Sequence, residues 1–216
     1  MPPISPSPTI TDRRRLYEIL AILFLALGRL VFMVELGWRL PFIAVVILGW
    51  GGYVYQRLQD EPELKTYWGL TTDDFRRDFL RLLPIALACV ALFVAYGFYF
   101  ETEVLDWSLL LILLVYPIWG VAQQFLALSI FARHLKDGWG GGRADWLVIL
   151  CTGGLFGLIH YPFPLLMGAT FLLGLTYAYL YLRGYNILVL GLYHGWLGGV
   201  FFYTVLGRNS FAEAFG

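Results

Sequence analysis

The chain has 216 residues, of which 59% are hydrophobic and 14% are charged, and its formal net charge is zero. Soluble domains are roughly 45–50% apolar and about 25% charged, so this composition indicates a membrane protein. A net charge of zero provides no basic field for nucleic acid and no acidic tail for a cationic partner, and we therefore expect contact with membrane lipid and none with nucleic acid.

Seven apolar stretches approach the length of about 20 residues that a membrane-spanning helix needs. They come after a Pro- and Ser-rich start, residues 1–15, which we expect to be a disordered cytoplasmic segment, and they precede a tail, 207–216. The predicted spans are 16–36, 40–55, 82–100, 108–131, 146–161, 165–182 and 187–206. The first is longer than a signal-peptide core and lacks a small-x-small cleavage site, so we expect it to be a membrane span and not a signal peptide. The fold class predicted is all-α, with one transmembrane domain over 16–206.

A short amphipathic helix is predicted between the second and third spans. Thr72 or Asp73 is suited to cap its first turn, because both side chains accept hydrogen bonds from free amides. Phe75, Phe79 and Leu82 then fall on one helical face. We expect this face to lie on the membrane surface.

Lysine and arginine are distributed unevenly between the two sides of the membrane. In a chain that begins in the cytoplasm, only Arg39 and Arg208 lie outside, and twelve lie inside: Arg13, Arg14, Arg15, Arg57, Lys65, Arg76, Arg77, Arg81, Arg133, Lys136, Arg143 and Arg183. Cytoplasmic loops carry such an excess. We predict a cytoplasmic N-terminus in an inner or plasma membrane. A half-helix near Pro162 would reverse the orientation of the spans after it.

Few polar side chains lie within the predicted spans. Gln123 and Gln124 lie in the fourth span, His160 ends the fifth, and His194 lies within the seventh. A single residue of this kind is explained by a hydrogen bond between helices. Three helices that each bring polar groups favour a shared polar cavity, and we predict that these four side chains meet in one.

The other ionisable groups near the spans have simpler explanations. Glu18 and Glu35 lie close enough to the ends of the first span to reach the interface. Arg29 is deeper, and we expect it to pair with a carboxylate in the core. His134 stands among basic residues at the predicted cytoplasmic end of the fourth span, where we expect a solvated surface role.

Glycines recur every four residues in two of the predicted spans. Gly191, Gly195 and Gly199 do so in the last span, and Gly153 and Gly157 do so in the fifth. Small residues at this spacing let helices approach closely. We interpret both patterns as packing features.

The fifth to seventh spans also carry motif-like patterns. Residues 154–160 read GLFGLIH and contain F-x-x-x-H, with Phe156 and His160, and residues 171–183 lead through Asn186 to His194. Together with Trp68 ahead of the third span, these residues resemble the CAAX prenyl protease and bacteriocin-processing (abortive infection, CPBP) family of intramembrane proteases. The resemblance covers roughly residues 68–205.

This resemblance implies an all-helical membrane fold with the motifs E-E-x-x-x-R, F-x-x-x-H and H-x-x-x-N on separate helices. It also implies hydrolysis in which glutamate and histidine activate water against a peptide bond near a membrane anchor. The chain departs from the motifs by having Gln123 and Gln124 at the glutamates, Leu128 at the arginine and Gly198 at the asparagine. The implied catalytic positions are His160, His194, Gln123 and Gln124, and the implied cavity-lining positions are Phe156, Leu128 and Gly198.

The two glutamines change the chemistry, because an amide cannot accept a proton as a general base. A hydrolase would need His160 or His194 as the base, with Gln123 and Gln124 as orienting and oxyanion groups. The substrate would be a membrane-anchored peptide or protein. The alternative is a catalytically inactive member that acts as a membrane scaffold or as a peptide- or lipid-binding regulator, so enzyme status stays open.

We expect no cofactor and no metal. Zinc sites generally use three or four protein ligands, and His160 and His194 have only Cys151 as a nearby addition.

Overall fold

The computed structural model describes residues 10–103, 106–139 and 145–215, and within these ranges every regular element is a helix. Most of the segment predicted to be disordered, residues 1–9, lies outside the described residues. Its last residues are ordered, contrary to the prediction, because Thr11 caps the first helix. The Thr11 hydroxyl accepts from the Arg14 amide, and the helix begins at Asp12.

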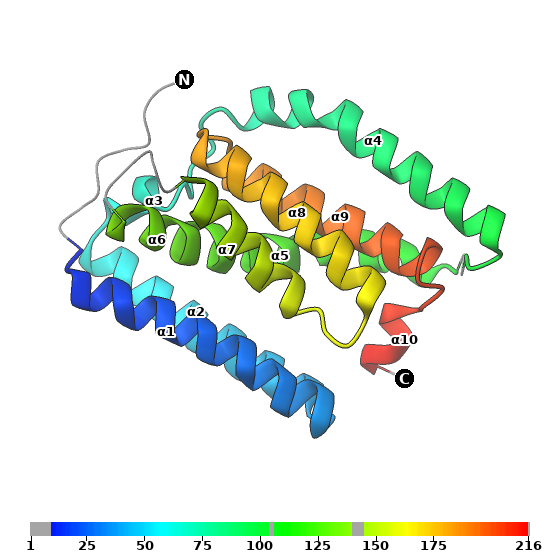
Figure 1. Ribbon diagram of the computed structural model, residues 1–216, viewed down its shortest axis with the longest axis horizontal. Coiled ribbons are helices and arrows are strands. Elements are labelled where there is room, and N and C mark those ends of the chain that lie inside the picture. Colours follow the sequence, from blue (N-terminus) through cyan, green and yellow to red (C-terminus); the bar gives the residue numbers. More distant parts are fainter. Residues whose placement is uncertain (1–9, 104–105, 140–144, 216) are drawn as a thin grey trace. The chain divides into compact units, whose positions relative to one another are not determined.

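The helices succeed one another along the chain as Figure 1 shows. Their bounds are α1 Asp12–Gly28, with the π-helical continuation η1 Arg29–Glu35, α2 Arg39–Asp60, α3 Leu64–Tyr67, α4 Phe75–Phe100, α5 Ser108–Gln124, η2 Phe125–Ala132, α6 Arg133–Gly138, α7 Asp145–Leu158, α8 Pro164–Leu182, α9 Ile187–Thr204 and α10 Ser210–Phe215. Each predicted span coincides with one or more of these helices. The short α10 lies in the predicted tail and was not expected.

Five helical segments of the described chain are long and apolar enough to cross a membrane. They are Asp12–Glu35, Phe75–Phe100, Ser108–Gly138, Pro164–Leu182 and Ile187–Thr204. α7 is apolar but has only 14 residues, and α2 is not among the five. The chain is therefore an all-α polytopic membrane protein, and a count of seven spans stays a prediction for α2 and α7.

The chain divides into two compact units. The first unit comprises residues 1–71 and 125–184, and the second comprises residues 72–124 and 185–216. α1, α2, α3, η2, α6, α7 and α8 thus belong to the first unit, whereas α4, α5, α9 and α10 belong to the second.

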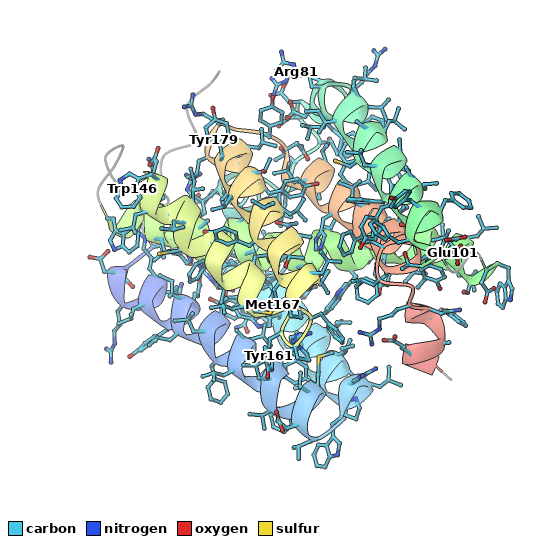
Figure 2. All side chains as sticks on the ribbon, turned by 45° about the vertical axis from the view of Figure 1, so that its right-hand side comes forward. Arg81, Glu101, Trp146, Tyr161, Met167 and Tyr179 are labelled. Carbon is cyan, nitrogen blue, oxygen red and sulfur yellow. The ribbon has the colours of Figure 1, made fainter. Side chains whose placement is uncertain are left out.

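In the first unit, α7 and α8 form a closely packed antiparallel pair. Figure 2 shows Trp146 and Tyr179 toward one end of the pair and Tyr161 and Met167 at the other. A Cβ atom on Gly153 would lie 2.6 Å from Leu175 Cδ2 and 3.1 Å from the Leu175 backbone nitrogen, so a larger residue would require both the Leu175 side chain and the α8 backbone to shift. The prediction that Gly153 is a packing residue is confirmed.

In the second unit, α5 packs against α9 along a line of glycines. A Cβ atom on Gly191 would lie 2.4 Å from Val121 Cα, and one on Gly195 would lie 2.5 Å from Pro117 Cα. Because these atoms belong to the backbone, the helices would have to separate to admit any side chain. The packing role predicted for this glycine series is confirmed.

The predicted surface helix is not a separate element. Phe75 and Phe79 lie at the start of α4, which continues without a break through the third predicted span. Phe79 stacks on Tyr193 of α9, with 5.2 Å between ring centroids. Part of the apolar face therefore packs against α9. A protein neighbour accounts for the spacing of the apolar residues as well as a membrane surface does. The predicted side-chain cap is also absent, since Asp74 is the N-cap and makes no capping hydrogen bond.

Candidate functional site

Two of the predicted site residues meet within the second unit. Gln124, the last residue of α5, is 1% exposed, and His194 of α9 is 7% exposed. Gln124 Nε2 lies 3.1 Å from His194 Nδ1. Because an amide nitrogen only donates, Nδ1 accepts this bond and the neutral imidazole carries its proton on Nε2. Gln124 thus makes His194 a donor through Nε2 and occupies the lone pair of Nδ1.

Gly198 leaves space beside this imidazole. The nearest atom that a Cβ at position 198 would meet is His194 Cδ2, at 3.9 Å. Cδ2 adjoins Nε2 in the ring, so the space borders the protonated edge of His194. Gln123 is half-buried, and no described residue gives its side chain a hydrogen bond.

His160 and Phe156 lie in the first unit, at the end of α7. His160 Nδ1 lies 2.6 Å from the main-chain oxygen of Phe156, and the two rings meet edge to face with 5.1 Å between centroids. A carbonyl oxygen only accepts, so Nδ1 carries the proton and Nε2 keeps a lone pair. The F-x-x-x-H spacing therefore has a direct chemical effect, because it sets the tautomer of His160 opposite to that of His194. Leu128, in η2, is fully buried.

The predicted convergence of Gln123, Gln124, His160 and His194 involves residues of both units and stays a prediction.

Arg29 lies beside the turn that contains His160. Its Nη1 donates to the main-chain oxygen of Tyr161, 2.9 Å away, and Tyr161 is labelled in Figure 2. The expectation of a carboxylate partner was wrong. A main-chain carbonyl in the turn after α7 is the acceptor instead, because the end of the helix leaves such groups without helical partners.

Glu18 and His134 form a buried pair that the sequence did not predict. Their side chains are 5% and 0% exposed, and His134 Nε2 donates to Glu18 Oε2. Tyr53 donates to the other carboxylate oxygen, and Arg57 Nε lies 3.8 Å from it. The expectations of an interfacial Glu18 and a solvated His134 were both wrong. We call Glu18, Tyr53, Arg57 and His134 the Glu18 cluster.

The Glu18 cluster pairs an acidic side chain with basic ones, and an isolated charge would be very unfavourable in an apolar interior. Arg57 also binds Glu61 at the end of α2, so the cluster links α1, α2 and α6. A carboxylate within an apolar span was the signal available in the sequence. It was misleading because Glu18 is near enough to the helix start to reach water by itself.

A second polar group lies next to α6. Tyr67 donates to Asp137 Oδ2 at 2.5 Å, and the Arg133 guanidinium lies over the Tyr67 ring, 4.4 Å from its centroid. Burial and this hydrogen bond to a carboxylate raise the pKa of the Tyr67 hydroxyl. The group therefore ties α3 to α6 with Tyr67 in its neutral form.

Neither polar region provides a set of metal ligands: in the described part of the chain, no group of three or more His, Cys, Asp and Glu residues could hold an ion.

The three histidines of the chain should give distinguishable signals in the spectrum of ¹⁵N-histidine-labelled protein. In their neutral forms, we expect His160 to carry its proton on Nδ1, and His134 and His194 to carry theirs on Nε2. In Gln124→Glu the new carboxylate accepts from Nδ1, so the His194 proton should move to Nδ1 while the other two signals remain. Single His→Gln variants assign the signals. A proton on Nδ1 of His194 in the unmodified protein would contradict the donor role of Gln124.

Comparison with known proteins shows that part of this chain is similar to one family. Residues 104–200, slightly less than half of the chain, match the family described as type II CAAX prenyl endopeptidase Rce1-like. No curated protein and no solved structure matches the chain. The matched region includes both histidine motifs but excludes α1 and α2. The match supports the resemblance inferred from the motifs: the chain is an integral membrane protein in which residues 104–200 are similar to type II CAAX prenyl endopeptidases.

Proposed function

We propose that this protein is a CAAX-protease-like intramembrane peptidase that cleaves membrane-anchored peptides, with His160 as its general base. The observation that carries the proposal is the hydrogen bond from His160 Nδ1 to the Phe156 carbonyl. This bond orients the ring and leaves the Nε2 lone pair to accept a proton. His194 is the weaker candidate for the base, because its Nδ1 already accepts from Gln124.

In the proposed reaction, His160 Nε2 takes a proton from water as the water oxygen attacks the carbonyl carbon of the peptide bond. The tetrahedral intermediate then collapses, and the imidazolium returns the proton to the leaving nitrogen. The products are a carboxylic acid and an amine, and His160 is neutral again. A positioned base of this kind contributes about 10²–10⁴-fold to the rate.

The test is cleavage of a reporter peptide that carries a lipid anchor, by protein reconstituted in lipid vesicles. His160→Ala and His160→Gln should lower the cleavage rate by about 10²-fold or more, since neither side chain can take the proton. Tyr161→Phe is the control, because residue 161 contributes its main chain and its side chain is 50% exposed. Cleavage that persists in the His160 variants, with unfolding midpoints unchanged, would refute the assignment.

A second candidate function is supported by the Gln124–His194 hydrogen bond. At the positions where the family has a carboxylate and a histidine, this Gln–His pair has no carboxylate to act as a base, which suits binding of a peptide or lipid without its hydrolysis. This candidate predicts that the reporter binds without being cleaved. It also predicts that Gln123→Glu and Gln124→Glu, together, either restore cleavage or weaken binding.

A further inference from the structure

Arg29 brings a cation to the candidate base from outside the family-matching region. It begins η1, at the far end of the first candidate span from Asp12. Its guanidinium donates to the carbonyl of Tyr161, the residue directly after His160. The same helix is held eleven residues earlier by Glu18, roughly 16 Å along its axis at 1.5 Å per residue. The helical segment that carries Arg29 is therefore held in place by Glu18 and by the hydrogen bond of Arg29 itself.

The single hydrogen bond of Arg29 offsets little of the free-energy cost of placing a guanidinium in an apolar helix. Charged side chains within apolar spans are rare and unfavourable, and they are functional candidates by default. Arg29 is half-buried, and none of its other N–H groups donates to a described residue. The guanidinium has five N–H donors in a planar fork, so most of its donor capacity is available to a ligand.

The helix also changes its winding at this residue. The α-helical hydrogen-bonding pattern of α1 ends at Gly28 and a π-helical pattern begins at Arg29. π-helical turns within helices occur frequently at functional sites. The change to π-helical hydrogen bonding and the charged side chain thus both occur at Arg29.

We propose that Arg29 is the electrophilic partner of His160, and that its guanidinium binds the carbonyl oxygen of the peptide bond under attack. The inference rests on the proposed peptidase function and names a further catalytic residue for it. The negative charge that develops on this oxygen in the tetrahedral intermediate is then stabilised by a cation that the hydrogen bond to the Tyr161 carbonyl holds beside His160. The arginine position of the family motif cannot supply this charge, because Leu128 stands there and is fully buried.

The test compares Arg29→Gln, Arg29→Lys and the control Arg13→Gln in the lipid-anchored reporter assay. Removing one oxyanion donor typically lowers kcat by about 10²–10³-fold, so we expect a loss of this size in Arg29→Gln with KM changed less than about twofold. Arg29→Lys keeps the charge but not the planar fork and should retain part of kcat. Arg13 is an exposed residue of the same helix, and its variant should behave as the unmodified protein does.

The ¹⁵N signals of His160 separate a catalytic role from a structural one. We expect them to be unchanged in Arg29→Gln, because the Phe156 carbonyl still holds Nδ1. Displaced His160 signals, or a kcat equal to that of the unmodified protein while His160→Ala is inactive, would overturn the role of Arg29 and leave the peptidase function standing. Failure of the unmodified protein to cleave the reporter would instead refute the peptidase function, and this inference with it.

Discussion

Glu18→Ala should destabilise the protein by about 3–5 kcal/mol, the usual cost of removing one partner from a buried ion pair. The substitution leaves the buried His134 without its hydrogen-bond acceptor and removes one of two carboxylates near Arg57. It also removes the acceptor of the Tyr53 hydroxyl. The measurement is the free energy of unfolding in detergent, monitored by circular dichroism.

Glu35→Ala is the matched control for this prediction. Glu35 ends the same continuous helical segment but is exposed, and surface substitutions usually change stability by less than about 0.5 kcal/mol. Equal unfolding free energies for the two variants would show that the Glu18 cluster contributes no stability. A large loss in Glu18→Ala alone would establish that α1 is held to α6 by this carboxylate.

Gly195→Ala should be destabilising by about 1–3 kcal/mol or more, because its Cβ would lie 2.5 Å from Pro117 Cα and from Tyr116 O. Both atoms belong to the backbone of α5, so no rotation of a side chain relieves the clash. The loss should exceed the gain of about 1 kcal/mol that alanine brings to a helix over glycine. Unfolding of the purified variant in detergent measures the net effect.

Gly198→Ala provides the comparison within the same turn of α9. Its Cβ would have His194 Cδ2 as its nearest neighbour, at an ordinary van der Waals distance of 3.9 Å. The helix propensity of alanine should then dominate, and the variant should be neutral or more stable by up to about 1 kcal/mol. If the two variants were equally destabilised, the close contact of α5 and α9 at Gly195 would be refuted.

Hydropathy and the spacing of small residues were sufficient to predict the helices and part of their packing. Each predicted span coincides with a helix because a run of apolar residues in lipid must satisfy its backbone internally, and this requirement is local. The glycines of α9 and α7 were also interpretable, since their spacing places them on one face whatever lies opposite. The packing of Phe79 on Tyr193 was not predicted, because spacing does not distinguish a protein neighbour from a lipid surface.

The histidine motifs illustrate a second limit. The sequence predicted His160 and His194 as site residues, but the residue type does not show which ring nitrogen carries the proton. That depends on what each nitrogen contacts. For His160 the partner is four residues away, and for His194 it is 70 residues away.

Apolar runs and motif spacing thus predicted a helical membrane protein with a region similar to CAAX proteases, and the helices and the family match support both. Only the tertiary structure showed which partners the ionisable side chains contact. Glu18 and His134 are separated by 116 residues, and Arg29 and Tyr161 by 132. Each of these side chains has an acceptable local explanation in isolation, and only the packing of α1 against the rest of the first unit removes water from Glu18 and brings Arg29 to the turn of His160.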